Sequence, residues 1–565
     1  MDGKVIRTVF DLLSQFGVET LVCSSGSRNV SLLMEADQWS RLKKFVVADE
    51  RCAGFVALGN AMVARKPVGL ICTSGTALLN YAPAVAEAYY QNVPLIILSA
   101  DRPMEWIDQD DSQTIRQPGV FANFSKYCID LDATREDSEY LWYANRVVNE
   151  SLITALSGRK GPVHINIHLP GNPIMPLGRH TVTGRKFDVV NPDKKLSRED
   201  LKKLVGMAAG KKIMITAGFM PPDNRLQKGM SILASLPNVC VMAETISNLH
   251  LPTECYQVDA PLFSLAGGEM PAEARSKYSP DILISIGGAL VSRQLKEFLR
   301  RCSPECHWSV GQFKNVVDCF RSLTSVIDTE PADFIPYFAR RLQRLQSSSP
   351  DKDLPQFSRC WAELRKAVAR PRRSFPWSDL TALEMIFRKL PSSSNLFLSN
   401  GTSVRYAQIL CHRPPHASYS NRGVSGIEGS TSTAIGGMLA YPGMSVLITG
   451  DLSFAYDIGA LGTYLADGRL KVVVLNNGGG DIFRFIKATS ELRIREEYLC
   501  VDKGSDLRMI AATYGWNYFE ASSAKSLSKV LPDFLSESDS PSLLDLQTFR
   551  DNLNADTLRS FLNIT

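Results

Sequence analysis

The same local pattern occurs near each end of the chain: a short apolar run, a turn with glycine, a helical pattern and a second apolar run. In the first copy, apolar runs over 66–74 and 93–101 enclose a predicted helix over 77–92. The two strands of such a unit lie parallel, because the helix crosses back over one face of the sheet. The pattern therefore predicts an α/β fold with largely parallel sheets flanked by helices.

The second copy has apolar runs over 444–451 and 471–480, with a predicted helix over 453–467 between them. Between the two copies lies a third α/β block, with predicted strands over 211–218, 238–244 and 281–288. We therefore expect three α/β layers, of which the outer two are related in architecture.

A chain of 565 residues is too long for one core, since domains contain about 150 residues on average. Polar stretches over 180–200 and 347–356 predict linkers. We therefore predict three domains, which cover 1–180, 181–350 and 351–565.

Composition and charge exclude several classes of binding partner. The net charge is only +5 and there is no basic tract, which argues against nucleic acid. The sequence contains no run of about 18 apolar residues, so no transmembrane helix is expected. The start of the chain has an amphipathic helical pattern rather than that of a secretory signal. Dispersed cysteines are typical of free thiols in a reducing compartment, so we expect a cytoplasmic protein. Cys302 and Cys306 lack a second ligand pair at zinc spacing, and we predict no metal there.

Polar residues follow two neighbouring strands of the second copy. Asp451 follows the first of these strands, and Asn477 and Gly479 follow the next. The carboxyl ends of parallel strands meet at one edge of a sheet, so these residues should converge. A carboxylate, an amide oxygen and the Gly479 carbonyl suit Mg²⁺, with Mn²⁺ as an alternative, and Mg²⁺ completes its octahedron with phosphate oxygens. Ser453 is predicted to cap a helix whose NH groups face the same anion.

The spacing of this motif is informative. Gly450-Asp451 and Asn476-Asn477 are separated by 24 residues, which resembles the signature of enzymes that bind thiamine diphosphate through Mg²⁺. A tight turn and a glycine-rich loop of another doubly wound domain are the alternative interpretation.

Thiamine diphosphate needs a carboxyl group against its pyrimidine ring, because proton sharing there activates the reactive carbon. The candidate is Glu50, where a predicted strand over 45–49 ends and an Ala/Gly-rich helix begins. Taken alone, a glutamate at this place is more often a helix-start residue favoured by the helix dipole. The turn at Thr73–Thr76 resembles the pyrimidine-binding part of the same enzymes and favours the catalytic role.

Longer motifs extend the resemblance to nearly the whole chain. The chain resembles the 2-succinyl-5-enolpyruvyl-6-hydroxy-3-cyclohexene-1-carboxylate synthases, the thiamine-dependent enzymes of menaquinone biosynthesis. GDL here replaces the GDG of acetolactate synthases and pyruvate decarboxylases. The motifs are SGSRN (25–29), DERCAGFVALG (49–59), TSGTALLN (73–80), PLIILSADRP (94–103), QTIRQPGVF (113–121), SNRGVSGIEG (420–429), GDLSFAYD (450–457) and NNGGGDIF (476–483).

The resemblance implies that 2-oxoglutarate is decarboxylated and that its succinyl unit is added to isochorismate. It also makes 1–180 the pyrimidine-binding domain and 351–565 the diphosphate-binding domain, and leaves the central domain without a readable function. Both substrates are anionic, so arginines should line the pocket. Each arginine alone is more often a surface or ion-pair residue.

The implied roles fall into three groups. Glu50, Gln113 and Arg28 are the catalytic candidates, and Ile427 bends the cofactor. The cofactor-binding candidates are Glu50, Thr73, Gly401, Ile427, Gly450, Asp451, Leu452, Ser453, Asn477, Gly479, Asp481 and Ile482. The substrate-binding candidates are Ser27, Arg28 and Arg102 for isochorismate, Arg405 and Arg422 for the succinyl unit, and Gln113, Arg293, Ile482 and Phe483 beside them.

The chain departs from the family pattern on the side of the acceptor substrate. Ser25 replaces a proline, Ser112 replaces an asparagine, Gly401 replaces a serine and Arg293-Gln294 replaces a Lys-Arg pair. Two alternatives therefore stay open: a diverged carboligase or 2-oxo-acid decarboxylase with another acceptor, and a non-catalytic paralogue. The family also implies a homodimer or homotetramer, with the cofactor between the first domain of one chain and the third domain of another.

Overall fold

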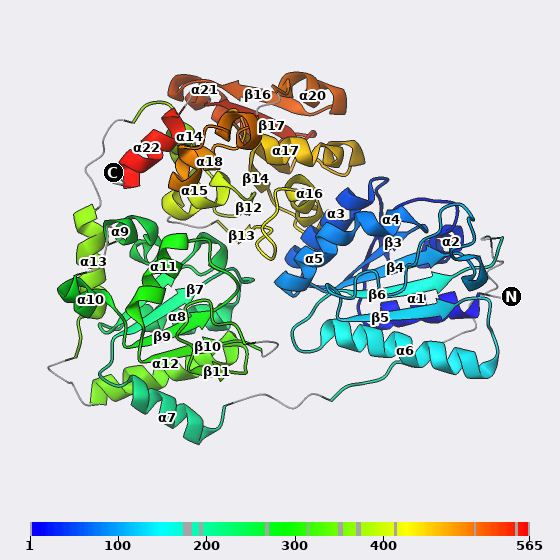
Figure 1. Cartoon of the computed structure of the whole chain (residues 1–565), viewed down its shortest axis with the longest axis horizontal. Helices are drawn as coiled ribbons and strands as arrows, with labels where there is room; N and C mark the ends of the chain where they lie inside the picture. The colour runs from blue at the N-terminus through cyan, green and yellow to red at the C-terminus, as the bar shows by residue number, and fades with distance from the viewer. Residues whose placement is uncertain are drawn as a thin grey trace.

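The computed structural model describes residues 3–172, 174, 184–190, 196–265, 271–312, 316–348, 354–368, 375–411, 415–501, 504–548 and 552–562. The predicted domain boundaries at 180/181 and 350/351 lie outside these residues and stay predictions. Three parallel sheets, each flanked by helices, confirm the predicted α/β fold. Figure 1 shows the N-terminal sheet in blue and cyan, the central sheet in green and the C-terminal sheet in yellow to red.

The N-terminal sheet has six parallel strands in the order β2-β1-β3-β4-β6-β5. Helices α3, α4 and α5 cover one face, and α1 and α6 cover the other. The strands are β1 (Thr20–Cys23), β2 (Lys43–Val46), β3 (Val68–Cys72), β4 (Leu95–Asp101), β5 (Tyr127–Asp132) and β6 (Val163–His168). The helices are α1 (Lys4–Gln15), α2 (Val30–Gln38), α3 (Glu50–Ala64), α4 (Thr76–Asn80), α5 (Ala82–Gln91) and α6 (Ser138–Leu156), with a 3₁₀ turn η1 (Met104–Trp106).

The predicted helix over 77–92 is two helices, α4 and α5, which meet at Tyr81. Pro83 lies at the start of α5. Its ring excludes the preceding turn and it has no NH to donate, so a helix begins there rather than continues.

The central sheet has five parallel strands in the order β11-β10-β9-β7-β8 and a core of its own. The strands are β7 (Ile213–Ala217), β8 (Val239–Ala243), β9 (Ile282–Ile286), β10 (Cys306–Val310) and β11 (Ser325–Ile327). The helices are α7 (Arg198–Ala208), α8 (Asn224–Ala234), α9 (Asp259–Ser264), α10 (Ala272–Tyr278), α11 (Arg293–Cys302), α12 (Pro331–Ser348) and α13 (Phe357–Val368), with 3₁₀ turns η2 (Thr245–Ser247) and η3 (Thr253–Tyr256).

The C-terminal sheet has the order β13-β12-β14-β15-β17-β16, which repeats the order of the N-terminal sheet strand for strand. The strands are β12 (Asn395–Leu398), β13 (Ala417–Tyr419), β14 (Ser445–Gly450), β15 (Leu470–Asn476), β16 (Asn517–Ala521) and β17 (Ser542–Gln547). The helices are α14 (Asp379–Phe387), α15 (Thr402–Leu410), α16 (Ser430–Leu439), α17 (Asp451–Tyr456), α18 (Ile482–Phe485), α19 (Lys487–Ser490), α20 (Leu507–Tyr514), α21 (Ala524–Phe534) and α22 (Leu553–Leu562), with short turns η4 (Ile458–Thr463) and η5 (Arg495–Leu499).

The predicted helix over 453–467 is wrong in both extent and start. The helix α17 begins at Asp451 with Gly450 as its N-cap and ends at Tyr456, and the 3₁₀ turn η4 follows. Ser453 therefore lies inside α17 and is not its cap. Asp457 interrupts the helix because its carboxylate accepts hydrogen bonds from the backbone NH and hydroxyl of Ser432, at 2.7 and 2.9 Å.

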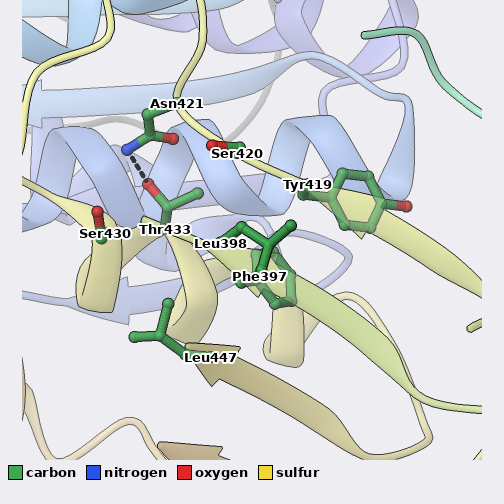
Figure 2. A pocket seen from close by; sticks show the side chains of 8 residues that line it. All are labelled: Phe397, Leu398, Tyr419, Ser420, Asn421, Ser430, Thr433 and Leu447. Atoms are coloured by element: carbon green, nitrogen blue, oxygen red, sulfur yellow. Dashed lines mark hydrogen bonds between the residues drawn. The ribbon is translucent and has the colours of Figure 1, made fainter. Parts of the chain in front are cut away.

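A small cavity lies between β12, β13 and α16 (Figure 2). The amide of Asn421 donates to the Thr433 hydroxyl at 3.1 Å on its wall. Its volume of about 10 Å³ accommodates one water at most, so it is part of the packing and not a ligand site.

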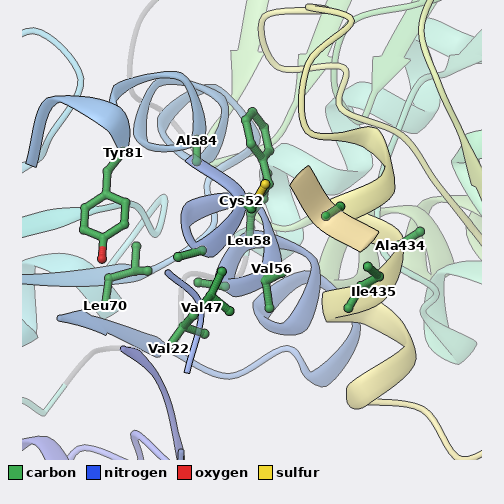
Figure 3. Close-up of a cluster of buried hydrophobic side chains, with 14 of the residues drawn as sticks. Val22, Val47, Cys52, Val56, Leu58, Leu70, Tyr81, Ala84, Ala434 and Ile435 are labelled. Atoms are coloured by element: carbon green, nitrogen blue, oxygen red, sulfur yellow. The ribbon is translucent and has the colours of Figure 1, made fainter. Parts of the chain in front are cut away.

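The N-terminal and C-terminal sheets share one hydrophobic core, in which α3 packs along α16 (Figure 3). The two helices approach closely because each has a glycine at the contact. A Cβ on Gly436 would lie 1.9 Å from the Val56 carbonyl oxygen, and one on Gly59 would lie 1.9 Å from that of Thr433. Any larger residue at either position must push the helices apart.

We predict that Gly436→Ala destabilises the protein by about 3 kcal/mol, the upper end of the range for overpacked cores, because the new methyl group meets backbone that cannot rotate away. The measurement is the shift in urea midpoint. Gly206→Ala is the matched control, since Gly206 lies in α7 with no atom within 4 Å of an added Cβ, and it should be neutral or stabilising. Equal midpoints for the two variants would contradict the tight crossing of α3 and α16.

Candidate active site

The residues of the predicted metal motif converge at the carboxyl edge of the C-terminal sheet. One carboxylate oxygen of Asp451 accepts hydrogen bonds from the backbone NH groups of Asn477 and Gly479, at 3.2 and 2.8 Å. The other accepts from the NH of Leu452 at 2.7 Å. Three successive glycines with positive φ, Gly478 to Gly480, curl the loop so that these NH groups face Asp451.

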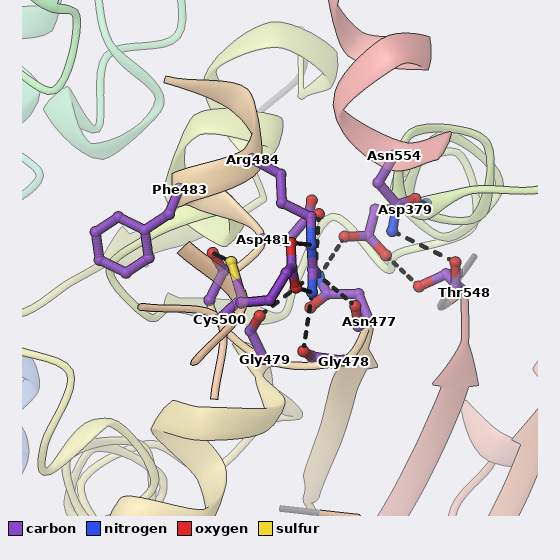
Figure 4. Close-up of polar contacts among 12 residues, drawn as sticks. Asp379, Asn477, Gly478, Gly479, Asp481, Phe483, Arg484, Cys500, Thr548 and Asn554 are labelled. Carbon is purple, nitrogen blue, oxygen red and sulfur yellow. Dashed lines mark hydrogen bonds and ion pairs between the residues drawn. The ribbon is translucent and has the colours of Figure 1, made fainter. Parts of the chain in front are cut away.

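Asn477 is oriented by a buried partner. Its amide nitrogen donates to a carboxylate oxygen of Asp379 at 2.7 Å (Figure 4). Burial is the main cause that raises the pKa of Asp379 to about 6.

The donor set fits a hard cation. It combines the Asp451 carboxylate, the amide oxygen of Asn477 and the Gly479 carbonyl, all of which are oxygen ligands of the kind that Mg²⁺ takes. A small pocket opens beside them, lined by Asp451, Leu452, Asn476 and Gly479 on one side and by Val501 and Leu507 on the other. The motif therefore has the donor chemistry of a cation site, at the mouth of a pocket of about 20 Å³.

Arg484 closes the other side of the loop. It donates to the carbonyl oxygens of Asn477 and Gly479, both at 3.4 Å, and pairs with Glu496 at 2.8 Å. Asp481 lies 3.6 Å from the Arg484 guanidinium, and burial raises the pKa of its carboxyl group. Ile482 and Phe483 follow on α18 and are half-buried, and the Phe483 ring points away from the polar network in Figure 4.

Ser453 connects the metal motif to Ile427. Its hydroxyl donates to the Ile427 carbonyl oxygen at 2.5 Å, while the Ile427 side chain is 40% exposed. An exposed isoleucine held by its backbone is available for contact with a ligand, as the predicted bending of the cofactor requires.

The N-terminal sheet presents a second set of loops at its own switch point, between β1 and β3. The Ser24–Arg28 loop touches the Thr73 turn, since a Cβ on Gly26 would lie 2.4 Å from the Cβ of Thr73. The hydroxyls of Thr73 and Ser74 are buried and have no hydrogen-bond partner among the described residues. Buried hydroxyls without a hydrogen-bond partner are uncommon in folded proteins. A ligand with polar ring atoms, such as a pyrimidine, would supply the missing partners.

Glu50 is the first residue of α3, and Asp49 caps that helix through the NH of Cys52 at 3.1 Å. The pKa of Glu50 is raised, chiefly by burial and also by the charge of Asp49. A half-buried carboxyl group with a raised pKa suits the predicted proton sharing.

Arg28 and Arg102 lie together at the same edge. Arg28 is buried and donates to the Pro170 carbonyl oxygen at 2.8 Å. Its pKa is lowered by burial and by the charge of Arg102. Arg102 pairs with Asp111 at 3.3 Å and donates to the Ser112 carbonyl oxygen at 2.9 Å. Arg102 is therefore tied to the loop that carries Ser112, whereas Arg28 is held by the segment that follows β6.

The remaining N-terminal candidates, Gln113 and Ser27, are exposed at this edge. Gln113 has a φ of 61° and lies against Gly75, where a Cβ would be 3.1 Å from its side chain. Gln117, which the sequence did not single out, fixes this turn by accepting from the Gly75 NH at 2.7 Å.

A second arginine pair, Arg405 and Arg422, lies at the edge of the C-terminal sheet. Arg405 donates to the Gly401 carbonyl oxygen, and Arg422 donates to the side-chain oxygen of Asn400 at 2.9 Å. Burial lowers the pKa of both arginines, and Arg422 lowers that of Arg405 further. Gly401 has φ 92° and ψ −132°, a conformation that side chains rarely adopt, so a serine there would be strained.

Arg293 is placed away from this pair. Its side chain is 72% exposed and forms an ion pair with Glu297 at 2.6 Å. Lys296, one turn further along α11, is half-buried and donates to the Leu290 carbonyl oxygen at 3.1 Å. The pKa of Lys296 is lowered by burial and by Arg422, against the opposing effect of the buried Glu244. Lys296 is thus a half-buried cation of the central domain whose pKa responds to the charge of Arg422.

Comparisons with known proteins agree with this geometry. Residues 4–120 match the family model "Thiamine pyrophosphate enzyme, N-terminal TPP binding domain", and residues 399–546 match its C-terminal counterpart. Fold, site and both matches define a thiamine-diphosphate-dependent enzyme.

The curated relatives narrow the class. A Porphyromonas gingivalis protein named 2-succinyl-5-enolpyruvyl-6-hydroxy-3-cyclohexene-1-carboxylate synthase is 41% identical over 99% of this chain and 97% of its own length. Proteins of the same name from Cytophaga hutchinsonii and Bacteroides thetaiotaomicron are 35% and 34% identical, over 96% and 94% of the chain and 96% and 93% of their own lengths. The chain belongs to the 2-succinyl-5-enolpyruvyl-6-hydroxy-3-cyclohexene-1-carboxylate synthase family. Within its described residues, none of the helices combines the length and apolar character needed to cross a membrane.

Proposed function

We propose that the chain decarboxylates 2-oxoglutarate and adds the succinyl unit to isochorismate, the reaction that the family resemblance implies for menaquinone biosynthesis. The observation that carries the proposal is the presence of two separate arginine pairs, Arg28 with Arg102 and Arg405 with Arg422, each at the carboxyl edge of a different sheet. Two anionic substrates need two such sites, and arginine matches carboxylates in geometry as well as charge.

Residues of the N-terminal and C-terminal domains have different roles in binding the cofactor. Asp451, Asn477 and Gly479 hold Mg²⁺, or Mn²⁺ in its place, and through it the diphosphate. Bound thiamine diphosphate supplies the carbanion chemistry that side chains cannot provide. Glu50 would hold and exchange a proton at the pyrimidine ring, and the exposed side chain of Ile427 would contact the cofactor.

The substrate side is shared between the sheets. Arg28 and Arg102 bind the isochorismate carboxylates, with Ser27 and Gln113 beside them. Arg405 and Arg422 bind the distal carboxylate of the succinyl unit, and we add Lys296 to this pair because Arg293 points to solvent. Ile482 and Phe483 form the apolar wall.

The active enzyme is a homodimer or homotetramer in this proposal. A site that uses both arginine pairs is completed when the N-terminal sheet of one chain faces the C-terminal sheet of another.

A substrate comparison tests the proposal. With Mg²⁺ and thiamine diphosphate present, 2-oxoglutarate should be decarboxylated and, with isochorismate, should give the succinylated product. Pyruvate lacks the distal carboxylate, and losing a charge-assisted contact of about 1.5–3 kcal/mol should lower kcat/KM by roughly 10- to 100-fold. Faster turnover of pyruvate would favour an acetolactate-type carboligase or decarboxylase, and no turnover of either acid would favour a non-catalytic paralogue.

A further inference from the structure

The carboxamide of Asn477 has two ends of nearly the same size and opposite chemistry. The oxygen accepts and can bind a cation, whereas the NH₂ group only donates and repels one. A metal ligand of this type works only if the rest of the protein decides which end faces the metal. In this chain the NH₂ end is held by Asp379, at 2.7 Å.

Asp379 is itself fixed by three separate parts of the C-terminal domain (Figure 4). It is the first residue of α14 and is fully buried. The carboxylate oxygen that does not contact Asn477 accepts from the hydroxyl of Thr548, just beyond β17. Its backbone NH donates to the side chain of Asn554, on α22, at 2.9 Å. The carboxylate is therefore held in one place and orientation.

We propose that Asp379 is a positioning residue for the metal site: by accepting only from the NH₂ end of Asn477, it turns the amide oxygen of Asn477 toward Asp451 and the diphosphate. The inference rests on the proposed metal site and adds to it the group that orients one of its ligands. A flipped carboxamide would place its oxygen against the Asp379 carboxylate, where two acceptors have no hydrogen to share. Partners that orient metal ligands in this way typically change metal affinity by about 10- to 100-fold when removed.

Asp379→Asn is the direct test, because the new amide has the same shape and can either donate to or accept from Asn477. Both orientations of Asn477 then become acceptable. Mg²⁺ is titrated into the full-length protein at a fixed concentration of thiamine diphosphate, and the change in tryptophan fluorescence is followed. We expect the apparent Kd for Mg²⁺ to rise by about 10- to 100-fold.

Two further variants separate orientation from general stability. Thr548→Val removes the hydroxyl from the other Asp379 oxygen but leaves the contact with Asn477, so it should lower the urea midpoint with a smaller effect on Mg²⁺ affinity. The double variant Asp379→Asn with Asn477→Asp exchanges the two groups: the amide now donates to a carboxylate whose second oxygen faces the metal. It should recover most of the affinity lost in Asp379→Asn.

The outcomes are distinguishable. Wild-type protein that binds thiamine diphosphate equally well without Mg²⁺ would overturn the proposed metal site and this inference with it. Wild-type dependence on Mg²⁺ together with unaltered affinity in Asp379→Asn would overturn the inference alone. So would Mg²⁺ affinities that simply follow the urea midpoints of Asp379→Asn and Thr548→Val, with no recovery in the exchanged pair.

Discussion

Replacing Glu50 by glutamine should lower kcat by about 10²- to 10⁴-fold, the range in which positioned acid–base groups contribute. Glutamine keeps the size of the side chain and its place at the start of α3, but its amide cannot transfer a proton to the pyrimidine ring. Burial raises the pKa of Glu50, which makes it a better partner for a weakly basic ring nitrogen than an exposed carboxylate would be. Binding of Mg²⁺ and of the diphosphate should be nearly unchanged, because those contacts lie on the C-terminal sheet.

The measurement is steady-state turnover of 2-oxoglutarate together with cofactor binding by calorimetry. Glu19→Gln is a suitable control, since Glu19 is exposed and its carboxylate forms a surface ion pair with Lys66 at 2.6 Å. Wild-type turnover in Glu50→Gln would remove Glu50 from the mechanism, and equal losses of turnover and cofactor binding would make it a structural residue.

Replacing Asp451 by asparagine should weaken Mg²⁺ binding by on the order of 100-fold or more. The change removes the negative charge of the ligand, and it also removes the fixed orientation of the ligand oxygen. Thiamine diphosphate binding should fall with it, since the metal links the diphosphate to the protein. The same change also removes an acceptor for the NH groups of Asn477 and Gly479, so the loop should loosen.

Cofactor binding over a range of Mg²⁺ concentrations checks this prediction, and excess Mg²⁺ should partly restore it. Asp467→Asn serves as the control, because Asp467 pairs with Arg469 at 2.7 Å away from the proposed ligands. Undiminished binding in Asp451→Asn at low Mg²⁺ would be incompatible with the proposed cation site.

The sequence alone predicts the features that depend on the pattern of neighbouring residues. Apolar runs and turns placed the strands that lead to Asp451 and Asn477, and parallel topology brought these two residues together at one edge. The start of α3 at Glu50 followed from the same reasoning. These features are determined by the local sequence, and tertiary contacts do not alter them.

What the sequence could not predict depends on contacts between distant segments. The break after Tyr456 is set by the bonds of Asp457 to Ser432 in α16. Asp379 lies 98 positions from Asn477, and no motif connects them. The burial of Lys296 and the exposure of Arg293, one turn apart on α11, likewise follow from the packing of that helix and not from any motif.

The crossing of α3 with α16 has a consequence for how the protein is made. Part of the apolar surface of α3 is covered by its own sheet and by α5, and another part by residues of α16. The residues of α16 leave the ribosome about 370 residues later, or roughly 20 to 70 s at ordinary rates of translation. During that interval the first domain can form its sheet but not its complete core. We therefore expect apolar surface of α3 to stay exposed to solvent during most of translation. Chaperone occupancy should be highest on the first hundred residues of the nascent chain.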